Sequence, residues 1–190
     1  TLSDRITFNI KRLFHKKEQS KPYFSEDLIE QYEFFRRDIY NPLRVFYPCC
    51  NLDTSPIRGF PNSEVILMDK EEGLTKLMKQ EGIKQFIQED ILEYIPENPF
   101  DLIIILNPQL TSKDLTMHLS SKGYVLSNNY HNNASQLLED PIFEGIGTIA
   151  RNENELYLAK EDFSRLEPNQ FENYFYIFRR KEWNQNTLII

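Results

Sequence analysis

One acidic residue follows a short apolar segment at the place where nucleotide-binding proteins carry a residue that binds ribose. Asp69 comes directly after the apolar residues 65–68, about 20 residues past the end of the preceding apolar segment at Pro48. A carboxylate at that position accepts hydrogen bonds from both hydroxyl groups of a ribose. The alternative is an ordinary solvated acid at the end of a strand. Asp69 is therefore the leading candidate for a binding residue.

Residues 127–133 form an amide-rich segment that also contains an imidazole. His131 suits a general base because imidazole titrates near neutral pH, and Asn128 suits a residue that orients a ligand. Asparagines also cap turns and helices, and a lone histidine is often structural. Catalysis by His131 and Asn128 is thus one of two interpretations of this segment.

The two cysteines offer little chemistry. Cys49 and Cys50 are adjacent, and with three scattered histidines they match no zinc spacing. At the end of a buried strand, free cysteines behave as small apolar residues, and a reactive thiol needs nearby positive charge, for which the sequence supplies Arg44 and Arg58. We therefore expect no metal site, and a reducing compartment such as the cytoplasm.

These polar groups need strands that end at a common edge of a sheet. From residue 43 onward apolar segments alternate with helical ones, at residues 43–47, 65–68, 85–88, 102–106 and 124–127. Such runs are typical of strands buried on both faces. Helical segments at 71–80 and 112–121 end near Gly82 and Gly123. Because right-handed crossovers place helices on both faces, we expect a doubly wound, three-layer Rossmann-like α/β sheet of about seven strands.

Further segments flank this core. A helix is expected from its N-cap Ser25 to about residue 40, and residues 1–22 predict either a helix docked on the core or a basic amphipathic helix on a membrane or a partner. Strand-like segments at 143–150, 156–158 and 174–179 lack a full crossover, which predicts an antiparallel edge. A short helix at 160–168 and a loose tail at 184–190 complete the chain. We expect an N-terminal helical segment at 1–40, packed on a Rossmann-like domain at 41–190.

Composition and charge exclude several classes of protein. The 190 residues are 40% apolar with a formal charge of −7, which is typical of a soluble folded domain. No apolar run approaches the roughly 20 residues that cross a bilayer. Residues 1–22 carry +4, so the remainder carries −11. Nucleic acid is therefore disfavoured as a partner, because binding phosphates requires a basic surface.

The order of these elements resembles that of class I S-adenosylmethionine-dependent methyltransferases, in which the cofactor lies across the carboxyl ends of the first strands. The resemblance covers roughly residues 41–181 and implies that Asp69 binds the cofactor ribose. Asp90 and Ile91 match the family segment in which an acid binds the adenine amino group and the next apolar side chain packs on the ring. Asp90 alternatively caps the turn at 91–94.

Two departures from the family bear on activity. Asn107 and Pro108 fall where amino-methylating members carry an Asn-Pro-Pro-aromatic motif, but Gln109 and Leu110 follow, so the base-stacking platform is missing. A turn that ends a strand is the alternative for Asn107. The first loop, residues 47–56, contains no glycine, whereas glycine in this loop of the family lets the backbone approach the cofactor.

A brief helical turn fits in this loop. The side-chain hydroxyls of Thr54 and Ser55 would there replace the missing backbone donors to the cofactor. The loop and the segment at 128–134 together resemble a little-characterised bacterial branch of the fold. This resemblance supports the fold and does not indicate an activity. The candidate cofactor-binding residues are Pro48, Asp53, Thr54, Ser55, Asp69, Asp90, Ile91 and Asn107.

Three classes of function remain after these observations. The first is a methyltransferase that uses S-adenosylmethionine to modify a small molecule or a protein. The second is a non-catalytic binding or scaffolding module that has lost the cofactor loop. The third is a Rossmann protein that uses another nucleotide, against which the absent Gly-x-Gly-x-x-Gly motif argues. The N-terminal helices either cover the pocket or pair two chains in a homodimer.

Overall fold

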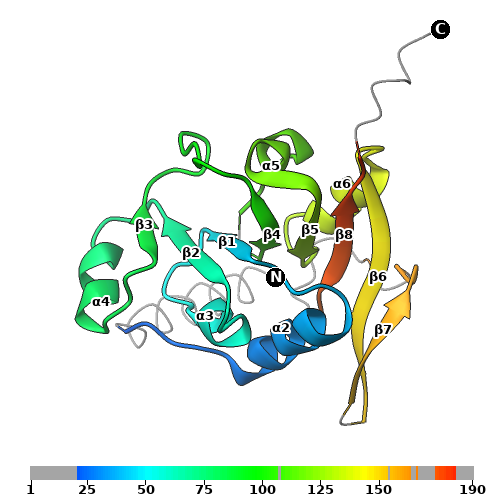
Figure 1. The fold of residues 1–190 in the computed structure, drawn as a ribbon, viewed down its shortest axis with the longest axis horizontal. Coiled ribbons are helices and arrows are strands. Elements are labelled where there is room, and N and C mark those ends of the chain that lie inside the picture. The colour runs from blue at the N-terminus through cyan, green and yellow to red at the C-terminus, as the bar shows by residue number, and fades with distance from the viewer. Residues whose placement is uncertain (1–20, 107, 154, 164–165, 167–173, 183–190) are drawn as a thin grey trace, which may run out of the picture.

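Eight strands form one sheet in the computed structural model, which describes residues 21–106, 108–153, 155–163, 166 and 174–182. The strands are β1 (Arg44–Pro48), β2 (Glu64–Asp69), β3 (Phe86–Gln88), β4 (Phe100–Ile105), β5 (Leu119–Ser127), β6 (Phe143–Asn152), β7 (Glu155–Lys160) and β8 (Tyr176–Arg180). Their order across the sheet is β3-β2-β1-β4-β5-β8-β6-β7 (Figure 1). Strands β1 to β5 are parallel, whereas β8 is antiparallel to both β5 and β6. The predicted doubly wound fold with an antiparallel edge is confirmed, with eight strands instead of about seven.

Helices cover both faces of this sheet and enclose two hydrophobic cores. The helices are α2 (Glu26–Asp38), α3 (Ser55–Gly59), α4 (Leu74–Gln80), α5 (Ser112–His118) and α6 (Asn133–Glu139). Figure 1 shows α2 and α3 on one side of the strands and α5 and α6 on the other. In β1, Val45 and Tyr47 belong to the first core and Phe46 to the second. Successive side chains of a strand point to opposite faces, so a strand covered on both sides is apolar throughout.

Helix α2 packs on the first core through an aromatic cluster. The buried ring of Tyr32 lies 5.4 Å from that of Phe60 and 5.3 Å from that of Phe175, measured between ring centroids. The close approach of α2 and α3 requires a glycine, because a Cβ atom on Gly59 would lie 2.4 Å from the Cβ atom of Tyr32. The helix predicted from Ser25 is therefore confirmed and is an integral part of the core.

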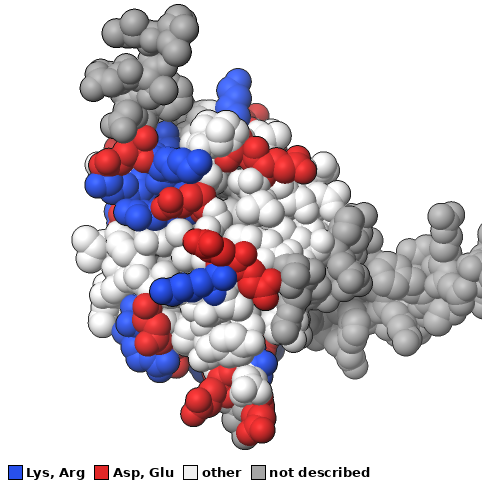
Figure 2. All heavy atoms as spheres, turned by 90° about the vertical axis from the view of Figure 1, so that its right-hand side faces the viewer, with Lys and Arg blue, Asp and Glu red and all other residues white. Residues whose placement is uncertain are grey.

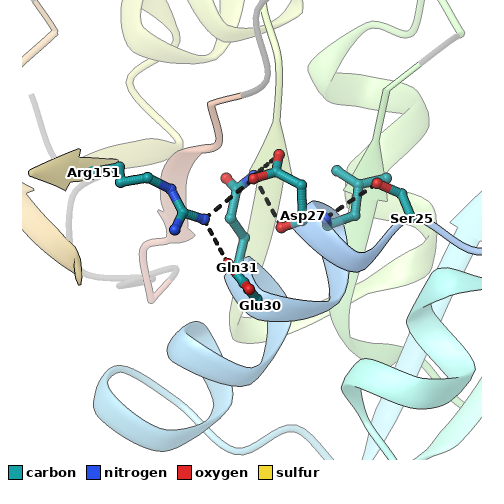
Figure 3. Close-up of polar contacts among 6 residues, drawn as sticks. Ser25, Asp27, Glu30, Gln31 and Arg151 are labelled. Carbon is teal, nitrogen blue, oxygen red and sulfur yellow. Dashed lines mark hydrogen bonds and ion pairs between the residues drawn. The ribbon is translucent and has the colours of Figure 1, made fainter. Parts of the chain in front are cut away.

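An ion-pair cluster joins the first turns of α2 to β6 (Figure 3). Nη2 of Arg151 lies 2.6 Å from Oε2 of Glu30 and 3.2 Å from Oδ1 of Asp27. Ser25 caps the same end of the helix, since its Oγ accepts a hydrogen bond from Leu28 N. The charged side chains are partly exposed, and such pairs contribute little to stability. The cluster orients α2 against the carboxyl end of β6.

The face of the molecule at the β6–β7 end carries mixed charge. Figure 2 shows Lys and Arg side chains beside Asp and Glu side chains on this face. Arg179 of β8 and Glu144 of β6 form an ion pair, with 3.6 Å between Nη1 and Oε1. Binding of duplex nucleic acid needs a continuous basic surface. The described residues of this face do not provide one.

The boundary between α5 and β5 differs from the prediction. The sequence predicts a helix to residue 121, but α5 ends three residues earlier, and Leu119 has an extended backbone with φ −93° and ψ 132°. Phe100 pairs with Leu119 and Leu102 pairs with Tyr124, so β5 bulges by three residues. Gly123, the expected helix end, is buried in this bulge, where a Cβ atom would lie 2.7 Å from Cδ1 of Leu119. The glycine therefore serves close packing instead of a helix cap.

Several predicted segments lie outside the described residues. They are the basic helix within residues 1–20, the tail at 184–190 and part of the segment at 160–168. None of the helices in the described ranges is both long and apolar enough to cross a membrane.

Candidate functional site

A cleft lies at the carboxyl ends of the strands around the point where the strand order reverses. Strands β2 and β3 follow outward on one side of β1, and β4 and β5 on the other, which is where open α/β sheets bind ligands. The cleft encloses about 280 Å³, and its lining residues are Cys49, Met68, Asp69, Lys70, Glu89, Asp90, Ile91, Leu92, Pro108, Gln109, Leu110 and Asp114. The fold thus brings three of the predicted binding residues, Asp69, Asp90 and Ile91, into one cavity.

Asp69 ends β2 and connects the cleft to the first loop. Its Oδ2 accepts a hydrogen bond from Asn51 N at 2.8 Å, and its Oδ1 accepts one from Glu71 N at 3.0 Å. A carboxylate has about four acceptor sites, so about two remain for a ligand. The side chain is partly exposed. Asp69 is therefore both a fixed and an available acceptor.

Asp90 follows β3 and caps the turn after it. Its Oδ1 accepts a hydrogen bond from Leu92 N at 3.1 Å, and its Oδ2 accepts one from Nζ of Lys70 at 3.0 Å. The hydrogen bond from Lys70 lowers the pKa of Asp90, so the carboxylate is ionised at neutral pH. The side chain of Ile91 is buried in the second core and also lines the cleft. The turn cap, which the sequence offered as an alternative for Asp90, is present, and it leaves acceptor sites open.

Asn133, to which the sequence pattern assigned no role, fixes one wall of the cleft. It begins α6 and is 2% exposed. Its Nδ2 donates to Pro108 O at 2.7 Å, and its Oδ1 accepts from Leu110 N at 3.4 Å. A buried amide nearly always has hydrogen-bond partners. In the sequence, Asn133 stands beside Ala134 and Leu137 on the apolar face of a predicted helix, and this position indicates a buried, hydrogen-bonded amide.

The ring of His118 packs behind the turn that carries Asp90 and Ile91. It is 1% exposed, and its centroid lies 5.6 Å from that of Phe46 and 6.0 Å from that of Tyr94. Burial lowers the pKa of His118, and a hydrogen bond with the Ile91 backbone partly opposes this. His118 therefore favours its neutral form and supports the turn as a core residue.

The cleft carries more acidic than basic groups. Asp69, Glu89, Asp90 and Asp114 face a single basic residue, Lys70, among its lining side chains. A cavity with an excess of negative charge attracts cations and repels phosphates. The described parts of the chain contain no group of three or more His, Cys, Asp or Glu side chains placed to hold a metal ion. The cleft lies just below the range of about 300–1,000 Å³ that is typical of pockets for drug-sized ligands, so it suits a small ligand or one portion of a larger one.

The first loop takes left-handed backbone conformations without glycine. The angle φ is 53° at Cys49 and 51° at Asn51. Such a conformation costs a residue with a Cβ atom roughly 1–2 kcal/mol, and asparagine tolerates it better than most. Cys49 lines the cleft, and burial raises the pKa of its thiol to about 11, so the thiol is neutral. Burial also raises the pKa of Cys50.

Asp53, Thr54 and Ser55 lie in the interior and do not line the cleft. Asp53 is 3% exposed; its Oδ1 accepts hydrogen bonds from Ser55 N at 2.9 Å and from Ser55 Oγ, and its Oδ2 accepts one from Tyr47 OH at 3.1 Å. Burial raises the pKa of Asp53, and these hydrogen bonds oppose the shift. Pro48 is likewise buried within β1 and away from the cleft lining.

The hydroxyls of Thr54 and Ser55 hold residues 23–25, here called the N-terminal strap. Thr54 N and Thr54 Oγ1 both donate to Tyr23 O at 2.8 Å. Ser55 Oγ accepts from Ser25 N at 2.8 Å, and Tyr23 N donates to Leu52 O at 2.9 Å. The strap therefore lies along the first loop and occupies the groups that the sequence offered as ligand donors.

The residues after β5 are not among those that line the cleft. Asn128 is 3% exposed, and its Oδ1 accepts a hydrogen bond from Tyr130 N at 3.3 Å, so it stabilises a turn. His131 is partly exposed, with its ring centroid 4.4 Å from that of Tyr130. Asn107 lies outside the described residues.

Solved structures of methyltransferases share this fold. The N-methyltransferase NodS from Bradyrhizobium japonicum WM9, in complex with S-adenosyl-L-homocysteine, has a TM-score of 0.58 and 10% identity over 87% of this chain and 91% of NodS. A putative caffeoyl-CoA O-methyltransferase from Staphylococcus aureus has a TM-score of 0.58 and 14% identity over 90% of this chain and 91% of its own. The 16S rRNA methylase RmtB has a TM-score of 0.50 and 17% identity over 82% of this chain and 62% of RmtB.

The chain therefore has the Rossmann-like fold of class I methyltransferases, as the order of its elements predicted. No protein-family model matches the sequence, and no curated protein matches it. The similar structures carry names that refer to different acceptors, including a ribosomal RNA, so the fold alone does not select a methyl acceptor.

Proposed function

We propose that the chain is an S-adenosylmethionine-dependent methyltransferase whose cleft binds the adenosine portion of the cofactor. The observation that carries the proposal is that Asp69, Asp90 and Ile91 meet in one cavity beside the reversal of strand order. Asp69 accepts from the ribose hydroxyls, Asp90 accepts from the adenine amino group, and Ile91 packs on the ring. S-adenosylmethionine supplies an activated methyl group when bound, so the protein mainly has to align the acceptor.

The charge of the cleft supports this ligand over a phosphate-bearing nucleotide. The sulfonium of S-adenosylmethionine is a cation, which suits the excess of acidic groups. A dinucleotide would bring phosphates to a cavity in which Lys70, its one basic lining residue, is already paired with Asp90. The cavity therefore favours S-adenosylmethionine over NAD.

The methyl acceptor in this proposal is a small molecule or a protein. The segment after β5 lies at the same edge of the sheet as the cleft, because β5 is parallel to β4. His131 is the proposed general base and Asn128 the residue that orients the acceptor. Asn107, which precedes the lining residue Pro108 in sequence, is kept as a proposed cofactor-binding residue. Support for His131 is its partial exposure, since a base must reach the acceptor.

A paired substitution tests the binding site. Asp69→Asn removes the negative charge of the group that accepts hydrogen bonds from the ribose hydroxyls. Each hydrogen bond to a charged group contributes about 1.5–3 kcal/mol to the free energy of the interaction. We expect affinity for S-adenosylmethionine to fall at least about tenfold by calorimetric titration. Asp101→Asn is the matched control, because Asp101 also accepts two backbone hydrogen bonds, from Leu43 N and Arg44 N, but at the opposite edge of the sheet. Equal affinities of the two variants would remove the ribose assignment.

A non-catalytic binding or scaffolding module is the second candidate, and the first loop favours it. The amide groups of Cys50, Asn51, Thr54 and Ser55 already donate within the protein. Thermal unfolding with added ligand separates the two candidates, because a ligand at 100 times its dissociation constant stabilises the folded state by about 2.7 kcal/mol. A chain of this size then melts about 5–11 °C higher. No shift with S-adenosylmethionine or S-adenosylhomocysteine would favour the module.

A further inference from the structure

We propose that the site recognises the nucleoside portion of its ligand alone, and that the first loop contains no receptor for an amino-acid portion. This inference rests on the proposed function, because it concerns the ligand of the same cleft. It predicts that nucleoside thioethers with and without the amino acid bind with similar affinity.

The amide groups of the first loop are the natural anion receptor in an open α/β sheet, because the turn after β1 faces the ligand crevice. In this chain five of those amide groups donate within the protein. The bonds are Cys50 N to Met68 O at 3.0 Å, Asn51 N to Asp69 Oδ2 at 2.8 Å, Asp53 N to Cys50 O at 3.0 Å, Thr54 N to Tyr23 O at 2.8 Å and Ser55 N to Asp53 Oδ1 at 2.9 Å. A ligand carboxylate would have to displace one of these internal acceptors.

Helix α3 offers no replacement for these donors. A helix usually begins with amide groups that lack a partner inside the helix, and these groups bind anions. In α3 the first amide, Ser55 N, donates to Asp53, Pro56 has no N–H group, and Ile57 N donates to Thr54 O at 3.1 Å. The helix is five residues long, so its dipole is also short.

The N-terminal strap fixes the loop in this closed arrangement. Tyr23 contributes both a donor to Leu52 O and an acceptor for the amide and hydroxyl of Thr54, and Ser25 N donates to Ser55 Oγ. Asp53, the carboxylate nearest to this region in sequence, is 3% exposed and does not line the cleft. Freeing the amide of Thr54 therefore means detaching the strap as well.

Cys49 belongs to the first loop and also lines the cleft. In dinucleotide-binding turns, glycine lets the backbone come close to the charged part of the ligand. Here Cys49 takes the left-handed conformation that glycine would take, and its side chain lines the cleft. Cys49 thus carries a Cβ atom and a thiol at a position where glycine would leave the backbone bare, on the wall of a cavity of about 280 Å³.

Two neutral thioethers isolate the amino-acid portion. S-adenosylhomocysteine and 5′-methylthioadenosine share the adenosine and the sulfur atom, and they differ in the amino acid. We expect calorimetric titration of the full chain to give dissociation constants within about threefold of each other. Binding of S-adenosylhomocysteine at least tenfold tighter, equivalent to about 1.4 kcal/mol, would overturn the inference and leave the proposed function in place. Failure of both ligands to bind would instead remove the proposed function.

A variant gives a second test on the same two ligands. Asp69→Asn acts on the shared ribose, so we expect it to weaken both ligands by the same factor, and Asp101→Asn to weaken neither. Loss of 5′-methylthioadenosine binding with retained S-adenosylhomocysteine binding would reveal a separate receptor for the amino acid and refute the inference.

Discussion

Replacing Asn133 by alanine removes both side-chain hydrogen bonds that fix the segment after β4. After the substitution, the buried carbonyl of Pro108 and the buried amide of Leu110 no longer have the Asn133 side chain as a hydrogen-bond partner. A neutral hydrogen bond contributes about 1 kcal/mol net, and an orphaned buried group costs about 1–3 kcal/mol. The bond to Leu110 is long at 3.4 Å and contributes less. We expect the free energy of unfolding to fall by about 2–3 kcal/mol, mostly through Pro108.

Urea unfolding followed by circular dichroism measures this loss. The midpoint should fall while the slope with denaturant stays unchanged, because the exposed surface is the same. The matched control is Asn132→Gly at the preceding residue. The side chain of Asn132 makes no helix-cap hydrogen bond, and its backbone has a left-handed φ of 61°. Glycine suits that backbone, so the control should keep the stability of the unsubstituted chain. A loss below about 1 kcal/mol for Asn133→Ala would refute the assigned role.

Two further substitutions test the core around the first loop. Gly59→Ala places a Cβ atom 2.4 Å from that of Tyr32 and should lower stability by about 1–3 kcal/mol, and an unchanged melting temperature would contradict the packing of α2 on α3. Burial raises the pKa of Asp53 in the folded state. The folded chain therefore binds more protons than the unfolded chain above the ordinary value of about 3.9, and stability contributed by Asp53 is lost as the pH rises through this window. Asp53→Asn should remove this part of the pH dependence in urea titrations, and parallel curves for the two proteins would contradict it.

The fold and the position of the cleft follow from local patterns in the sequence. Apolar runs such as residues 102–106 allow a strand covered on both sides, and the carboxyl ends of parallel strands meet at one edge. Asp69 and Asp90 each come at the end of such a run, so their meeting in one cavity is predictable from their place in the chain. The full length of β7 and the bulge in β5 required pairing information that the local patterns do not carry.

The first loop was beyond sequence reasoning for a physical reason. Asp53 and Asp69 both follow a strand, yet Asp69 lines the cleft and Asp53 is buried. What separates them is the docking of Tyr23, which lies 31 residues from its partner Thr54. The left-handed conformation at Cys49 also gave no signal, because such positions are normally recognised by glycine or asparagine.

The place of β8 in the sheet affects how the protein is made. Within the described chain, β8 comes last in sequence but lies between β5 and β6, and each of those strands pairs with it. Until residues 176–180 have left the ribosome, β5 and the β6–β7 hairpin each expose an open backbone edge that can pair with another chain. The nascent chain therefore remains two separate half-sheets until β8 emerges and pairs with both of them.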